Sequence, residues 1–161
     1  MILVLALSVG AFAFQNEPEG IKVKSVVSTN PLGLAQRVIN VSYERVLSPK
    51  LSIVLDPRFI FGEATGVGFI GGIRNYFSGT APEGFFIGGS GILASVSAGA
   101  VSGRAYGFGG DIGYKWISQN GFAIEAGLGL KFLSATASYL WYSATESGLV
   151  ATYLFGLGYA F

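Results

Sequence analysis

The sequence predicts an all-β fold, an eight-stranded antiparallel up-and-down barrel, from three observations. Large apolar residues alternate with small or polar ones along most of the chain, which is the period of a β-strand. Beyond the N-terminus the chain has no long uninterrupted apolar run of the kind that forms a membrane helix. All connections between the alternating segments except the last are short, which leaves no room for crossover helices and favours antiparallel neighbours.

The first 20 residues divide into a leader and a polar start. Residues 1–13 have the apolar core of a signal peptide and end in the small-x-small pattern Ala11-Phe12-Ala13, although the usual basic start is missing. A buried N-terminal strand is the alternative for this segment. Residues 14–20 then form a polar mature N-terminus, and residues 21–161 form a single barrel domain.

Eight strands follow from the alternation, and two of them are especially clear. From Tyr106 to Trp116, aromatic and aliphatic residues occupy the even positions except at Gly110, while glycine, aspartate and lysine occupy the odd ones. From Phe122 to Phe132 the pattern repeats, with glutamate and lysine on the face of small residues. The eight expected strands span residues 21–30, 37–47, 51–62, 67–77, 85–97, 105–117, 122–135 and 148–161.

The connections fall into two sets, one at each end of the expected barrel. Ser48-Pro49-Lys50, residues 78–84 and Gln119-Asn120-Gly121 share the end that holds both chain ends, and their proline and glycine residues stop the strands. Residues 31–36, 63–66, 98–104 and 136–147 form the opposite set, in which only the last connection is long.

That long connection carries Tyr139, Trp141 and Tyr142. These aromatic residues form either an exposed tip that binds a partner or an outer ring of aromatic side chains on a strand that simply continues. We favour the continuing strand, because such aromatic rings are common in membrane barrels.

The large apolar face is expected to point outward to lipid. The other face is mostly Gly, Ala and Ser with isolated charges, and glycine fits the narrow interior of a small barrel better than a solvated exterior. With 51% hydrophobic and 12% charged residues, the chain is more apolar than an ordinary soluble domain. A soluble, lipocalin-like barrel with the two faces reversed is the alternative. At the end that holds the chain ends, a predicted interfacial girdle comprises Phe77, Phe85, Trp116, Phe122, Tyr159 and Phe161.

The same facing places charged side chains in the lumen. If Gln119-Asn120-Gly121 is a hairpin loop with Gly121 in the left-handed region, Lys115 lies directly opposite Glu125. Asp111 and Lys131 are then diagonal neighbours. The predicted lumenal charge network comprises Glu44, Asp56, Arg58, Arg74, Asp111, Lys115, Glu125 and Lys131.

A turn at residues 48–50 places Glu44 diagonal to Asp56, with Arg58 or Arg74 as the cation that separates the two carboxylates. Such carboxylates are also the elements of general acid–base catalysis, but basic partners on the same face would keep both ionised. We therefore expect the charges to fill the lumen and specify the register, rather than to catalyse a reaction.

Several chemistries find no support in the sequence. The chain has no His and no Cys, which removes Ser-His-Asp catalysis, His-based metal sites and disulfides. Gly66 to Gly71 matches a dinucleotide-binding pattern, but no helix is expected to follow it. The net charge of +1 argues against a nucleic-acid partner. We expect no enzymatic activity, no cofactor and no metal.

Four segments resemble small bacterial outer-membrane β-barrel proteins of the OmpA/OmpX type: residues 40–45, 72–77, 109–116 and 158–161. The resemblance implies an eight-stranded transmembrane barrel in the bacterial outer membrane. It also implies that the terminal aromatic Phe161 is read by the outer-membrane assembly machinery. A structural or surface-interaction role in contact with membrane lipid is the expected function. A barrel that binds a small apolar ligand, soluble or with lateral entry from lipid, and a narrow pore are the alternatives, and the oligomeric state is left open.

Overall fold

The computed structural model describes residues 23–139 and 142–161, which form nine β-strands and one short 3-10 helix. The predicted signal peptide (residues 1–13) and polar N-terminus (residues 14–20) lie outside the described residues. The expectation of an all-β fold is confirmed. The elements are β1 (Ser25–Thr29), η1 (Pro31–Gln36), β2 (Val38–Asn40), β3 (Ser42–Ser48), β4 (Leu51–Ile60), β5 (Thr65–Tyr76), β6 (Gly84–Ala98), β7 (Val101–Ile117), β8 (Phe122–Tyr139) and β9 (Tyr142–Ala160).

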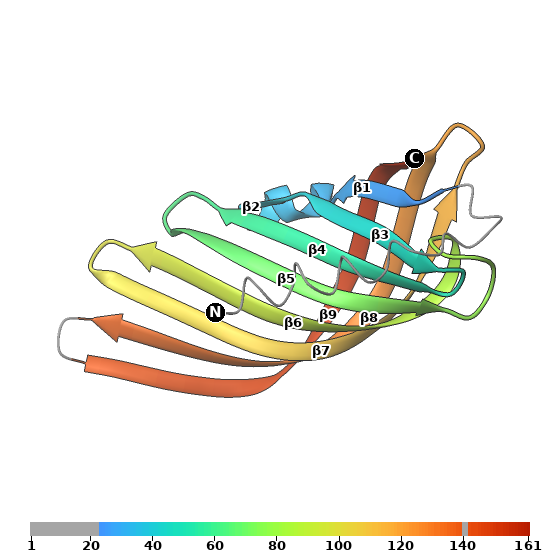
Figure 1. Ribbon diagram of the computed structural model, residues 1–161. Coiled ribbons are helices and arrows are strands. Elements are labelled where there is room, and N and C mark those ends of the chain that lie inside the picture. Colours follow the sequence, from blue (N-terminus) through green and yellow to red (C-terminus); the bar gives the residue numbers. More distant parts are fainter. Residues whose placement is uncertain (1–22, 140–141) are drawn as a thin grey trace.

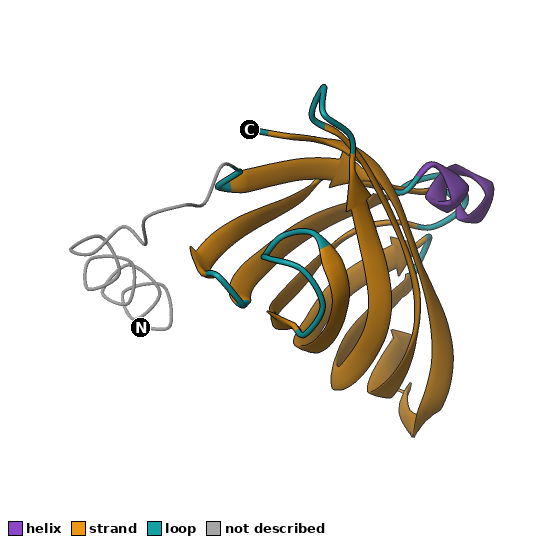
Figure 2. Cartoon of the chain, turned by 90° about the vertical axis from the view of Figure 1, so that its right-hand side faces the viewer, coloured by secondary structure: helices purple, strands orange, loops and turns teal. Residues whose placement is uncertain are grey.

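All the strands belong to one antiparallel sheet that closes in a ring (Figures 1 and 2). The order along the sheet is β2-β4-β3-β1-β9-β8-β7-β6-β5, and β5 also pairs with β4. From β3 to β9 each strand pairs with the next one along the chain, while β1 joins β3 to β9. The predicted antiparallel meander is therefore confirmed.

The strand count is nine rather than the predicted eight because the second predicted strand, residues 37–47, is interrupted. β2 and β3 pair with β4 in one continuous register, and the break falls at Val41. The Val41 N–H donates to the Pro57 carbonyl at 3.3 Å, but proline has no N–H to complete the reciprocal bond. β2 and β3 consequently share one position, and the ring has eight positions around its circumference.

The two ends of the ring differ. We call the end with the C-terminus and the turns after β3, β5 and β7 the terminal end, and the end with η1 and the turns after β4, β6 and β8 the distal end (Figure 1). Strand length increases steadily from 7 residues in β3 to 19 in β9, so the later strands reach further toward the distal end. Of the residues of β9, only 157–160 pair with β1. Among the described residues, the part of β9 from 142 to 156 pairs with β8 alone.

The long connection expected at residues 136–147 is wrong, because both flanking strands extend into it. β8 extends to Tyr139 and β9 begins at Tyr142. The hydroxyl oxygens of Thr136 and Thr145 lie 2.8 Å apart, and Ser147 donates to Ser134 at 2.9 Å. The reading in which the strand continues therefore agrees with the structure. The connection expected at residues 98–104 is also shorter, because β7 begins at Val101.

The sheet turns most of its large apolar side chains to the outside, and it turns charged side chains such as Glu44, Arg74 and Lys115 to the inside. Exposure alternates along β5 to β8, and outward side chains such as Leu93, Phe108 and Leu128 are 63–69% exposed. Inward side chains such as Glu44 and Lys115 are only 2% and 1% exposed. The predicted outward position of the large apolar face is thus confirmed, and its contact with lipid stays a prediction. No helix of the described segments is long and apolar enough to cross a membrane.

A small apolar core fills the terminal end of the ring. It contains Val46, Tyr76, Ala81 and Phe86, with the Tyr76 and Phe86 rings 5.4 Å apart. Ala81 belongs to the β5–β6 loop, and its N–H donates to the Pro49 carbonyl at 2.8 Å. The loop therefore folds over this end of the ring.

Candidate functional site

Four charged side chains from four strands meet inside the ring: Glu44 on β3, Arg74 on β5, Lys115 on β7 and Glu125 on β8. Arg74 Nη1 lies 2.8 Å from Glu44 Oε2 and 2.9 Å from Glu125 Oε2. Lys115 Nζ forms ion pairs with the same two carboxylates, at 2.9 Å from Glu125 Oε2. We call this group the charge quartet. Each cation contacts both anions, so the formal charges cancel within the group.

The β7–β8 hairpin brings Lys115 opposite Glu125, as the sequence predicts. Gly121 adopts a positive φ of 85°, and the Ser118 N–H donates to the Phe122 carbonyl at 2.8 Å, which closes the turn in the expected register. On the other side of β8, Gly156 lies opposite Glu125. A side chain at Gly156 would lie 2.8 Å from Glu125 Cγ, so the glycine makes room for the carboxylate.

The quartet is buried and fully hydrogen-bonded. Its side chains are only 2–8% exposed. Glu44 also accepts hydrogen bonds from Ser52 Oγ and from the Tyr76 hydroxyl, the latter at 2.7 Å. The Arg74 guanidinium lies 4.5 Å from the centre of the Phe86 ring. Buried charges are tolerated when they are paired and hydrogen-bonded in this way.

Asp56 and Arg58 form a separate pair on β4, with Arg58 Nη2 2.7 Å from Asp56 Oδ2. Asn40 Nδ2 donates to the other carboxylate oxygen of Asp56 at 2.9 Å. Glu44 lies opposite Val54 and is therefore diagonal to Asp56, as expected, and each of the two carboxylates has its own arginine, Arg74 for Glu44 and Arg58 for Asp56, rather than one arginine shared between them. Arg74 lies opposite Ser52, and from there its guanidinium reaches Glu44 and, across the interior, Glu125.

Asp111 and Lys131 are diagonal neighbours, as predicted, because Asp111 lies opposite Gly129 and Lys131 lies opposite Gly109. Within the described residues, however, their charged groups form no ion pair. The Asp111 carboxylate instead leans over Gly88 on β6, where a Cβ would lie 2.6 Å from Asp111 Oδ2. This position turns the carboxylate away from β8, so the diagonal register alone does not form the pair.

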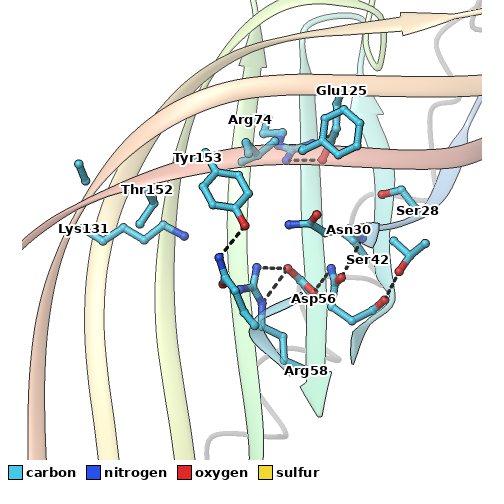
Figure 3. A pocket seen from close by; sticks show the side chains of 16 residues that line it. Ser28, Asn30, Ser42, Asp56, Arg58, Arg74, Glu125, Lys131, Thr152 and Tyr153 are labelled. Atoms are coloured by element: carbon cyan, nitrogen blue, oxygen red, sulfur yellow. Dashed lines mark hydrogen bonds and ion pairs between the residues drawn. The ribbon is translucent and has the colours of Figure 1, made fainter. Parts of the chain in front are cut away.

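A polar chamber of about 270 Å³ lies on the distal side of the charge quartet (Figure 3). Arg74 and Glu125 of the quartet line it at one side, and Arg58, Asp56 and Lys131 contribute further charges. The remaining lining is rich in hydroxyl and amide groups, from Ser28, Thr29, Asn30, Gln36, Asn40, Ser42, Thr152 and Tyr153.

Part of the chamber wall is built by η1 rather than by a strand. The Asn30 side chain caps η1 by accepting from the Leu32 N–H at 3.0 Å, and the Asn30 N–H donates to Asn40 Oδ1 at 2.9 Å. Gln36 Nε2 donates to the Tyr153 hydroxyl at 2.7 Å, which joins η1 to β9 beyond the end of β1. The sequence analysis treats residues 31–36 only as a connection and does not predict η1, although an Asn followed by Pro is typical of the start of a capped helical turn.

The six predicted girdle residues all lie in the terminal half of the ring and are 45–60% exposed. Phe77 and Phe85 stack with centroids 6.1 Å apart, and Phe122 lies opposite Tyr159. Trp116 lies near the end of β7, and Phe161 directly follows β9.

Two of the three residues of the predicted tip belong to the described part of the chain. Tyr139 and Tyr142 lie opposite each other in the last pair of the β8–β9 hairpin and are 50% and 72% exposed. Trp141 lies outside the described residues.

In the described part of the chain, no group of three or more His, Cys, Asp and Glu side chains is placed to hold a metal ion. Comparison of the chain with family models, curated proteins and solved structures finds no match. The resemblance to the OmpA/OmpX type therefore rests on the segments of this sequence alone.

Proposed function

We propose that this chain is a β-barrel protein of the bacterial outer membrane, with a structural or surface-interaction role. The observation that supports this proposal is the inverted distribution of side chains. Among the described residues, eleven polar or charged residues are buried but only eight apolar ones. A soluble domain of this size would bury its apolar residues, whereas a membrane barrel turns them toward lipid.

The outer surface has the features that a lipid contact requires. Phe69, Leu93, Phe108 and Phe132 border an apolar groove of about 470 Å³ on the outside of β5 to β8. The exposed aromatic residues of the terminal half are suited to the boundary between lipid and water, where aromatic rings are enriched. We infer that the girdle marks the periplasmic boundary of the membrane.

The C-terminal strand is the segment through which we expect the assembly machinery to act. The Phe161 N–H donates to the Ser25 carbonyl and the Ser25 N–H donates to the Phe161 carbonyl, both at 2.9 Å. These bonds join the last strand to the first and close the ring. In this proposal the assembly machinery first binds the terminal segment, and the segment then pairs with β1 and closes the ring.

The alternatives receive less support. A barrel for an apolar ligand needs an apolar interior, but the chamber is lined mainly by charges, hydroxyls and amides. A pore needs an open path, but the apolar core and the β5–β6 loop occupy the terminal end.

The test is the mobility of the chain on a gel, with and without boiling, in membrane and soluble fractions of the producing cell. A compact band that shifts on boiling and stays in the membrane pellet would support the proposal. A band in the soluble fraction without a shift would overturn it and favour a soluble barrel.

A further inference from the structure

We propose that the polar chamber binds a small hydroxylated anion, one that carries a phosphate or carboxylate group, through Lys131 and Arg58. The inference goes beyond a structural role in the membrane. It does not depend on membrane insertion, because the ring itself forms the chamber.

Lys131 provides the first argument. Its side chain lines the chamber, and Figure 3 shows the amine end pointing into it. Its stem lies over Gly109, where a Cβ would be 2.6 Å from Lys131 Cγ. Within residues 23–139 and 142–161, the amine makes no hydrogen bond and no ion pair within 4.0 Å. Its diagonal neighbour Asp111 is turned toward β6, which leaves the amine available to a ligand.

The charge balance of the lining provides the second argument. Three cations, Arg58, Arg74 and Lys131, line the chamber with only two carboxylates, Asp56 and Glu125. Glu125 is engaged by Arg74 and by Lys115 of the quartet, and Asp56 by Arg58 and Asn40. The positive charge of Lys131 is therefore the one that these two carboxylates do not contact. Asp111, which lines a neighbouring cavity together with Lys131, makes no ion pair with it, so an anion in the chamber would give the amine a direct partner.

Arg58 is placed to share the anion with Lys131. Its Nε and Nη2 atoms both bind the same oxygen of Asp56, at 3.2 and 2.7 Å. Its side chain remains 38% exposed, so part of the guanidinium still faces open space. A guanidinium and an ammonium that face one polar chamber form a suitable pair of donors for phosphate or carboxylate oxygens.

The size and lining of the chamber narrow the class of ligand. A volume of about 270 Å³ lies close to the lower end of the range of ~300–1,000 Å³ that small-molecule sites occupy, which suits a small ligand. Hydroxyl and amide groups of Ser28, Asn30, Gln36 and Thr152 lie around it and match a ligand with hydroxyl groups of its own.

Such an anion has two possible sources. A soluble ion can enter from the distal end, whereas the phosphate headgroup of an anionic lipid can enter from the side, between η1 and β9. On that side the pairing of β1 with β9 stops at Leu157. Beyond it, η1 is joined to β9 by the hydrogen bond between two exposed residues, Gln36 and Tyr153.

The experiment measures binding of inorganic phosphate by calorimetry to the folded chain in a maltoside detergent, which contains no phosphate. We expect saturable binding that weakens about tenfold or more in Lys131→Gln, the effect of losing a charge-assisted bond. Lys131→Arg should retain binding because it keeps the charge. Lys50→Gln is the matched control, because Lys50 is exposed at the terminal end and donates to the Gly79 carbonyl. Absence of saturable binding, or equal weakening in both glutamine variants, would overturn the proposal.

Two further arms complete the test. Phosphate binding that is lost in nanodiscs with phosphatidylglycerol but kept with phosphatidylcholine identifies a lipid headgroup, and binding kept in both identifies a soluble anion. If Lys131→Gln does not fold, amine acylation of the wild-type chain decides the question. Protection of Lys131 by phosphate, with Lys50 unprotected, supports the site, and equal labelling with and without phosphate refutes it. The calorimetry in detergent and the acylation of Lys131 do not depend on where the chain resides in the cell, so their failure remains distinct from failure of the membrane assay; only the nanodisc arm requires insertion.

Discussion

Lys115 and Glu44 form an ion pair across the full width of the ring. Their strands, β7 and β3, are diametrically opposed, with three strands between them in either direction. Arg74 and Glu125 complete the charge quartet from β5 and β8. The interior of an eight-position ring is just wide enough for side chains to fill it, so the quartet also connects strands that no backbone ladder joins, such as β3 with β7 and β5 with β8.

Removing one charge from the quartet should be costly. In Arg74→Ala the two carboxylates would retain only Lys115, which leaves one buried negative charge uncompensated. We expect the free energy of unfolding to fall by about 3–5 kcal/mol. Urea unfolding followed by tryptophan fluorescence measures the change. Arg104→Ala is the control, because Arg104 is exposed on β7, and an unchanged midpoint in Arg74→Ala would refute the prediction.

Removing one cation together with one anion should cost less than the two single changes combined. The double variant Lys115→Met and Glu125→Gln leaves the Arg74–Glu44 pair with balanced charge. Residues that share a buried pair couple by about 0.5–3 kcal/mol in double-mutant cycles. Unfolding free energies of the two single variants and the double variant give this coupling directly. Strict additivity would mean that Lys115 and Glu125 contribute independently.

The register of the β7–β8 hairpin was predictable, because the turn at Gly121 leaves only one way to align the two strands. The partners of Arg74 were not. Which carboxylates it reaches depends on strands that approach each other only after the ring closes, and no local rule gives that distance. For Asp111, too, the register was predictable but the partner was not. Its position diagonal to Lys131 is as predicted, but its side chain turns to the open space over Gly88.

The distal part of the β8–β9 hairpin was missed for a different reason. Residues 136–147 are mostly small and polar, so they lack the alternation of large apolar residues that predicts a strand. Backbone pairing with the neighbouring strand and hydroxyl contacts such as Thr136–Thr145 maintain the ladder instead. Pro57 led to the opposite error. The alternation continues through residues 37–47 and predicts one unbroken strand, but Pro57 interrupts the ladder opposite Val41 and divides it into β2 and β3.

Because the interior of the sheet is closely packed, a side chain should be tolerated less well at the inward-facing Gly127 than at the outward-facing Gly89. A Cβ at Gly127 would lie 2.5 Å from the Ile112 carbonyl oxygen and 2.8 Å from Gly113 Cα, whereas a Cβ at Gly89 would meet no atom within 4 Å. We expect Gly127→Ala to lower the free energy of unfolding by about 1–3 kcal/mol. Gly89→Ala should change it little. Equal urea midpoints for the two variants would contradict this account.

The filled terminal end should prevent steady conduction. Tyr76 and Phe86 are both 0% exposed, and Ala81 of the β5–β6 loop packs against them. The wild-type chain in a planar bilayer should therefore show no stable open level under voltage. Steady single-channel steps from protein of verified heat-modifiable mobility would instead support the narrow-pore alternative.

The outer face offers the sharpest test of lipid contact. Leu128 is 69% exposed and lies opposite Tyr153 at mid-height of the long strands. If this face touches lipid, Leu128→Arg should lower the free energy of unfolding from lipid vesicles by about 2–4 kcal/mol, because a charge is placed in the hydrocarbon layer. Thr145→Arg, exposed near the distal tip, should cost about 0–1 kcal/mol, because arginine near the interface is tolerated. If Leu128 faces water instead, both substitutions should leave stability nearly unchanged. Equal effects at the two positions would therefore count against a membrane-spanning wall.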